Sequence, residues 1–241
     1  MIDAVLLGAL AQSSLILTGL AVYFVTVPSK IVGSIAGYGV GALLGAVAFD
    51  LIPESSVLPT LETALWLIIG AGIFIVADYL VETRLGAGGG SGDKKDGEGQ
   101  GPMGIVVGSV VDGVPESLIF GIGIATLQPL SIPFLAAVFI SNVPQALAPS
   151  SDLAKSGWKP TRMTLMWAGV VIACGVAAGL GYLGASFLGD VTGGRAAALA
   201  AGGLLAMLTN SLVPFAYERA GAQAGIWCVV GFAVAVATSA S

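Results

Sequence analysis

The chain alternates between long apolar stretches and short polar ones. Eight of the apolar stretches approach the ~20 residues with which a helix crosses the hydrocarbon core of a bilayer. We therefore predict an all-α protein, a polytopic membrane bundle of eight transmembrane helices that forms one domain over residues 1–241. The predicted spans cover residues 4–26, 31–52, 61–81, 103–125, 130–151, 163–188, 196–216 and 223–240.

Composition supports a membrane location. Of the 241 residues, 56% are hydrophobic and only 10% are charged, which excludes an ordinary soluble domain. The chain has no histidine, so the commonest ligand of transition metals and the usual proton shuttle are both missing. Its two cysteines, Cys174 and Cys228, lie in predicted spans, where we expect small buried apolar side chains. We expect an integral, multi-pass protein of a lipid bilayer, a plasma membrane of prokaryotic type.

The basic residues predict how the bundle is oriented. Eight of the nine Lys and Arg follow an odd-numbered span, and only Arg195 follows an even-numbered one. By the positive-inside rule the first group is cytoplasmic, so both termini are predicted to be extracytoplasmic. The eight residues are Lys30, Arg84, Lys94, Lys95, Lys155, Lys159, Arg162 and Arg219.

The segment between the third and fourth spans differs from the rest of the chain. Residues 86–101 are mostly glycine, interspersed with Asp, Glu and Lys. This composition predicts a flexible, solvated cytoplasmic loop at about residues 84–102. Because the loop has neither His nor Cys, a metal-binding role there is disfavoured.

Two carboxylates stand inside the fourth predicted span. Asp112 and Glu116 are four residues apart, on one face of a helix, with Pro115 between them. An ionisable group at that depth usually faces a cavity or a partner and marks the path of an ion or substrate. Pro115 also frees a carbonyl near Val111, which adds oxygen to the same place. A cation site is one interpretation; the other is a proline kink with two acids held neutral or bonded to neighbouring helices.

Small residues recur every four positions in two of the spans. Such ladders allow helix backbones to approach closely in lipid, so both predict tightly packed helix faces. The ladders are Gly33, Gly37, Gly41 and Gly45 in the second span, and Gly113, Ser117 and Gly121 in the fourth.

Two pairs of spans repeat one another in short motifs. In each pair the predicted topology makes the two spans run in opposite directions. Paired interruptions in oppositely oriented repeats are typical of transporters whose binding site lies between the repeats. Residues 114–118 match 143–147 in Val, Pro and Leu, and residues 41–44 with 51–53 match 202–205 with 212–214.

These motifs resemble the ZIP family (Zrt-/Irt-like proteins), membrane carriers of divalent metals. The helix 4 motif of that family, His-Asn-x-Pro-Glu-Gly, is similar to residues 112–117, Asp-Gly-Val-Pro-Glu-Ser. Its helix 5 motif is similar to residues 141–146, Ser-Asn-Val-Pro-Gln-Ala, and the ends of its helices 2 and 7 to residues 49–54 and 210–214. The resemblance covers most of the chain and implies a 3+2+3 inverted-repeat arrangement with a variable loop after helix 3.

The chain departs from the family pattern at several ligands. Asp112 replaces the helix 4 histidine and Gly113 the asparagine, while Gln145 replaces a carboxylate and the sixth span has no acidic residue. A paired-metal centre is therefore not expected. Carried over residue by residue, the candidate metal ligands are Asp112, Glu116, Asn142 and Gln145, with Ser141 and, at the entrance, Asp50.

The substrate stays open between two classes of ion. A shell of oxygen atoms suits Mg²⁺, Ca²⁺ or Mn²⁺, whereas the resemblance favours zinc or iron. We predict a transporter for divalent metal cations through a site between the fourth and fifth spans, with the metal as substrate and no resident cofactor. The alternative is a non-transporting relative, a metal sensor or scaffold with a degenerate site. No enzyme motif and no nucleic-acid partner are expected, and a homodimer is left open.

Overall fold

The computed structural model describes residues 1–85, 102–127, 131–187 and 193–239. Within these ranges every regular element is helical, which confirms the predicted all-α class. The elements are α1 (Ile2–Gln12), α2 (Ser14–Ala21), α3 (Ser29–Ala46), η1 (Val47–Leu51), α4 (Ile52–Ser55), α5 (Thr60–Leu85), α6 (Pro102–Ala125), α7 (Ile132–Lys155), α8 (Pro160–Phe187), α9 (Gly194–Met207), η2 (Leu208–Leu212), α10 (Val213–Ala220) and α11 (Ala222–Ser239).

In the described part of the chain, eight helical segments are long and apolar enough to cross a membrane, as the hydrophobic pattern predicts. They are Ile2–Ala21, Ser29–Leu51, Thr60–Leu80, Gly104–Ala125, Ile132–Lys155, Pro160–Phe187, Gly194–Ala220 and Ala222–Ser239, numbered here as spans 1 to 8. Large apolar side chains of α5 and α11, such as Ile68 and Val229, are exposed, and the hydrocarbon of a bilayer is the solvent that suits them. The chain is therefore an integral, multi-pass membrane protein.

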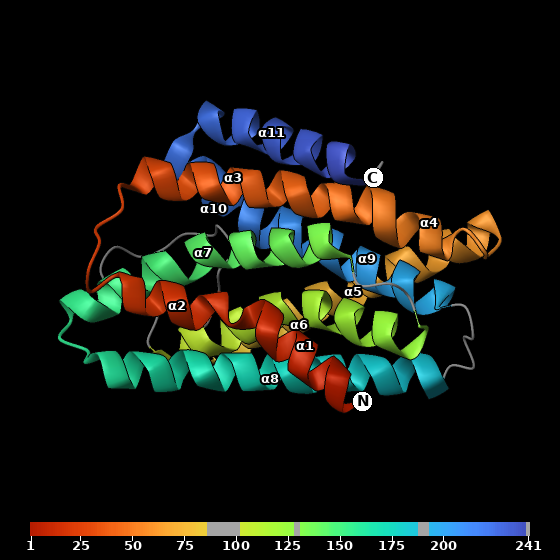
Figure 1. Cartoon of the computed structure of the whole chain (residues 1–241), viewed down its shortest axis with the longest axis horizontal. Helices are drawn as coiled ribbons and strands as arrows, with labels where there is room; N and C mark the ends of the chain where they lie inside the picture. Colours follow the sequence, from red (N-terminus) through yellow and green to blue (C-terminus); the bar gives the residue numbers. More distant parts are fainter. Residues whose placement is uncertain (86–101, 128–130, 188–192, 240–241) are drawn as a thin grey trace.

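Span 1 differs most from its prediction. The helix ends at Ala21, whereas the prediction carried it to residue 26, because the β-branched residues that follow lead into Pro28 in extended backbone. The helix is also interrupted at Ser13, whose amide and hydroxyl both donate to the carbonyl of Leu10, at 3.1 and 2.6 Å. Figure 1 shows α1 inclined to α2 at this point.

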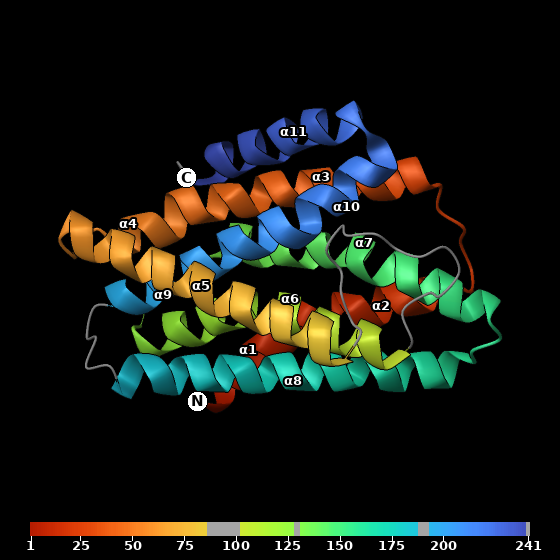
Figure 2. The same cartoon turned by 180° about the vertical axis from the view of Figure 1, so that it is seen from behind.

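The spans lie side by side along one direction, with their connections at two ends (Figures 1 and 2). The described ends of the chain point toward the same end of the bundle. The other end of the bundle holds the starts of α3 and α8 and the ends of α7 and α10. These four helix ends carry Lys30, Arg162, Lys155 and Arg219. This is the segregation of charge seen in the sequence. The predicted cytoplasmic loop lies almost entirely outside the described residues.

Glycine brings several pairs of helices into backbone contact, and the closest approaches join α3 to α11, α5 to α9 and α6 to α8. A methyl group built on Gly41 of α3 would lie 1.8 Å from the Cys228 carbonyl oxygen of α11. On Gly70 of α5 it would lie 1.9 Å from the Leu199 carbonyl oxygen of α9, and on Gly121 of α6 1.9 Å from that of Ala178 on α8. The whole ladder from Gly33 to Gly45 faces α10 and α11, so the predicted close packing is confirmed.

The second and seventh spans both contain one π-helical turn followed by proline. In η1 the amide of Ile52 donates to the carbonyl of Val47, and Pro53 follows; in η2 Val213 donates to Leu208, and Pro214 follows. Proline has no N–H and crowds the carbonyl one turn before it, so a widened turn relieves the clash. The two turns occupy equivalent positions of the repeated motif. The inverted-repeat arrangement itself stays a prediction.

Candidate cation site

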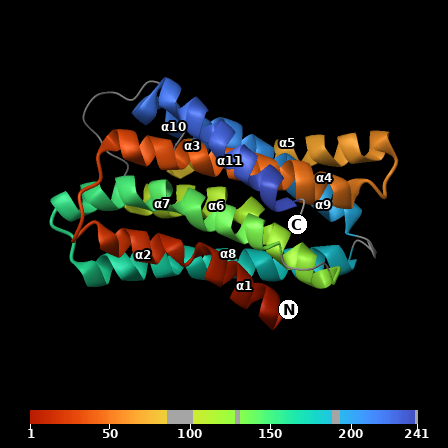
Figure 3. The same cartoon turned by 45° about the horizontal axis from the view of Figure 1, so that its top comes forward.

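Glu116 of α6 is the acid at the centre of the bundle. Its side chain is only 1% exposed. Helix α6 packs against α8, α9 and α1, and α7 lies beside α3 (Figure 3). One Glu116 oxygen, Oε2, accepts a hydrogen bond of 2.9 Å from the amide nitrogen of Gln12. The other, Oε1, lies 3.4 Å from the hydroxyl of Ser141. An acid in this position is held by neutral polar groups from two other spans.

Gln12 connects the fourth and fifth spans. It is 1% exposed, and its amide oxygen accepts a hydrogen bond of 2.9 Å from Nδ2 of Asn142, which is equally buried. The polar chain therefore runs from Asn142 through Gln12 to Glu116. Gln12 is the last residue of α1, directly before the irregular turn at Ser13, so the interruption in span 1 lies beside the polar chain.

Gln12 is not among the site residues predicted from the sequence. The signal was present, since Gln12 is an uncharged amide inside a long apolar stretch and two serines follow it. Polar residues of that kind commonly form hydrogen bonds between transmembrane helices. Its partners, however, lie 104 and 130 residues away in the sequence, and nothing local indicates them.

The predicted α7 ligands divide into two groups. Ser141 and Asn142 are buried and face the polar chain, whereas Gln145, one turn further on, is only half-buried. The Ser141 hydroxyl has a single proton and lies 2.9 Å from the carbonyl of Val138, so its contact with Glu116 at 3.4 Å is the weaker one. Asn142 is linked to Glu116 through Gln12, and the prediction that both residues supply oxygen to one ion stays a prediction.

Asp112 faces a different neighbour from Glu116. Its Oδ1 accepts a hydrogen bond of 3.0 Å from Ser211, which lies in the π-helical turn η2. The two carboxylates therefore make contacts on different helices, although they are one turn apart and interact electrostatically.

Asp50 belongs to a third contact, at the start of α7. Its Oδ2 accepts a hydrogen bond of 2.7 Å from Ser131, and Ser131 in turn accepts one of 3.2 Å from the amide of Phe134. Ser131 is the N-cap of α7, so the π-helical turn η1 is tied to the first turn of that helix.

The donor set limits what an ion could bind. Within the described ranges no three His, Cys, Asp or Glu side chains are grouped as metal ligands. An ion at Glu116 would depend on one carboxylate with amide and hydroxyl oxygens around it. This fits one cation better than a pair of metal ions.

Comparison with known proteins gives no match, either to the model of a protein family or to a curated protein. The resemblance to the ZIP family therefore rests on the motif residues alone.

Proposed function

We propose that the protein transports divalent metal cations across a membrane. The observation that carries this proposal is the burial of Glu116 among neutral groups. The two ion pairs found among the described residues, Lys155 with Asp152 and Arg195 with Glu62, do not include it. A carboxylate buried without a counter-charge costs several kcal/mol, roughly. A cation that enters the site would supply the missing charge.

The polar chain also provides oxygen ligands for such an ion. The Gln12 amide now presents nitrogen to Glu116, and rotation by half a turn would present oxygen instead. Ser141 and Asn142 add a hydroxyl and an amide oxygen from α7. The resemblance of residues 112–117 and 141–146 to the ZIP motifs supports the same function.

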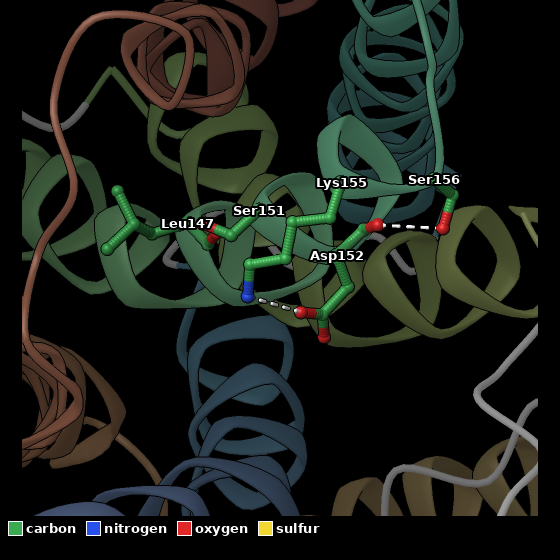
Figure 4. A network of polar contacts seen from close by, with 5 residues as sticks. All are labelled: Leu147, Ser151, Asp152, Lys155 and Ser156. Carbon is green, nitrogen blue, oxygen red and sulfur yellow. Dashed lines mark hydrogen bonds and ion pairs between the residues drawn. The ribbon is translucent and has the colours of Figure 1, made fainter.

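The test is flux of Zn²⁺ and Mn²⁺ into proteoliposomes. Glu116→Gln keeps the shape of the side chain and removes its charge. Because each ~1.4 kcal/mol is a factor of ten, we expect flux at low ion concentration to fall about a hundredfold or more. The control is Asp152→Asn, since the Asp152 side chain is 79% exposed and pairs with Lys155 at the end of α7 (Figure 4). Equal flux in wild type and Glu116→Gln would overturn the proposal.

A second candidate is a non-transporting metal sensor or scaffold. It is favoured by the hydrogen bonds that Glu116 already accepts and by the lack of a group of three ionisable ligands in the described part of the chain. Calorimetric binding of a metal ion without flux would support this candidate. Flux that depends on Glu116 would exclude it.

A further inference from the structure

The connection between α7 and α8 is rich in basic residues. Residues 152–162 carry three bases, Lys155, Lys159 and Arg162, but only one acid, Asp152. Lys155 and Asp152 form an exposed ion pair of 3.3 Å (Figure 4). Lys159 and Arg162 are also exposed, and neither takes part in an ion pair among the described residues. This end of the bundle therefore presents two unbalanced positive charges to its surroundings.

The same connection has a fixed shape. Helix α7 ends in a Schellman motif, in which Gly157 has a φ of 86° and its amide donates to the carbonyl of Ala154 at 3.0 Å. The amide of Trp158 donates to the carbonyl of Leu153 at 3.1 Å. From span 1, the hydroxyl of Tyr23 donates to the carbonyl of Trp158 at 2.7 Å. Trp158 is thus anchored by two spans and does not lie on a loose loop.

Trp158 holds one of the two cations in place. The guanidinium carbon of Arg162 lies 3.9 Å from the centroid of the Trp158 ring, which is a cation–π contact. The ring itself packs against the core cluster that includes Met163 and Trp167. Trp and Tyr side chains are enriched where a membrane protein meets the lipid headgroups, so Trp158 and Tyr23 mark that depth. Arg162 is therefore held at the level of the headgroups.

The start of α8 is a place that favours negative charge. The helix begins at Pro160, and the carbonyl of Lys159, the residue before it, accepts the amide of Met163 at 3.1 Å. The N-terminus of a helix carries a partial positive charge, which stabilises anions and disfavours cations. The first turn of α8 has no acid, and Lys159 and Arg162 add two cations there, three residues apart. A bound anion would stabilise this arrangement.

We propose that Lys159 and Arg162, with the ring of Trp158 beside them, form a binding site for the headgroup phosphate of an anionic phospholipid. The inference goes beyond the proposed transport function and does not depend on it. A lipid is the occupant, and not a soluble anion, because the aromatic pair places both cations at the bilayer surface. This end of the bundle is also the one predicted to be cytoplasmic, and the cytoplasmic leaflet is rich in anionic lipid.

Arg219 at the same end of the bundle is a useful contrast. Its guanidinium carbon lies 3.6 Å from the centroid of the Phe215 ring, so it makes the same kind of contact. However, Glu218 is its neighbour in sequence, and Asp152 is also within electrostatic range. Arg219 therefore has acids of the protein nearby. The lack of such acids at the start of α8 is what leaves a place for the lipid phosphate.

The experiment titrates the purified full chain in detergent with phosphatidylglycerol and, separately, with phosphatidylcholine. Native mass spectrometry gives the two dissociation constants. Wild type should bind phosphatidylglycerol about tenfold or more tightly, since only this lipid has a net negative charge. Arg162→Gln and Lys159→Gln should each weaken its binding about fivefold. The matched control is Lys30→Gln, which removes one exposed cation from the same end at the start of α3 and should keep wild-type affinity.

The Lys159→Gln variant separates lipid binding from folding. In lipid-free detergent it should unfold at the same temperature as wild type, because the Lys159 side chain has no hydrogen bond or ion pair within the described structure. Earlier unfolding would show that Lys159 stabilises another part of the protein, which overturns the proposal. Equal affinity for the two lipids, or an equal loss in Lys30→Gln, would also overturn it. So would displacement of phosphatidylglycerol by millimolar inorganic phosphate, which would indicate a site for a soluble anion.

Discussion

The two pairs of repeated motifs have become different structures. In spans 2 and 7 the proline follows a π-helical turn, whereas in spans 4 and 5 Pro115 and Pro144 stand inside continuous α-helices. The π-helical turns contribute Asp50 and Ser211, which bond to Ser131 and Asp112 on the two central helices. The central helices carry Glu116 and Asn142. The widened turns of spans 2 and 7 thus place side chains that bond to spans 4 and 5. Spans 4 and 5 carry the residues of the candidate site.

Disrupting the polar chain of Asn142, Gln12 and Glu116 should lower the stability of the protein more than disrupting the contact of either π-helical turn. Gln12→Ala removes the group between Glu116 and Asn142 and leaves both buried. We expect a loss of stability of about 2–4 kcal/mol, since each buried polar group without a partner costs about 1–3 kcal/mol. The measurement is unfolding in detergent followed by circular dichroism. Gln145→Ala, at the half-buried α7 amide, is the control and should lose far less; an equal loss in both variants would contradict the role of Gln12.

The hydrogen bond between Asp50 of η1 and Ser131 should make the second-largest contribution to stability. Ser131→Ala removes the N-cap of α7 and the hydrogen bond to Asp50, and we expect about 1–2 kcal/mol of destabilisation. Ser151→Ala serves as its control, because among the described residues Ser151 donates only to the Leu147 carbonyl of its own helix (Figure 4), and such bonds add little. The same unfolding assay compares them. If the two variants lose the same amount of stability, the contact between η1 and Ser131 does not stabilise α7.

The hydrogen bond between Ser211 of η2 and Asp112 should make the smallest contribution to stability of the three. Ser211→Ala removes one hydrogen bond to a half-buried acid, so we expect about 0.5–1.5 kcal/mol. A double-mutant cycle with Asp112→Asn separates the pair from its surroundings. A coupling energy near zero would show that the two π-helical turns, despite their equivalent positions, do not play equivalent parts.

The sequence predicts the parts of this structure that depend on nearby residues. The eight spans follow from runs of apolar residues, and the backbone contacts of Gly41 and Gly121 follow from four-residue spacing. The motif that ends in Pro53 and Pro214 marks the places of both interruptions. It does not distinguish a π-helical turn from a simple proline kink, because the same residues are compatible with both.

The candidate site could be predicted only in part. Asp112 and Glu116 lie one turn apart as expected, but the packing of spans 1 and 7 against α6 decides which way each acid faces. Gln12 lies 104 residues from Glu116 along the chain, and only the fold brings the two together. Neighbours of this kind are a matter of tertiary packing, on which helix periodicity carries no information.

The unequal lengths of the helices have a consequence for the surrounding lipid. Helix α8 has 28 residues and is about 42 Å long at 1.5 Å per residue, whereas α11 has 18 residues and is about 27 Å long. A hydrocarbon core is about 30 Å thick, so α8 requires tilt or a locally thicker bilayer while α11 requires a thinner one. The two lie on opposite sides of the bundle (Figure 1). The protein should therefore impose a thickness gradient on its lipid annulus, and its stability should vary with the acyl-chain length of the membrane around it.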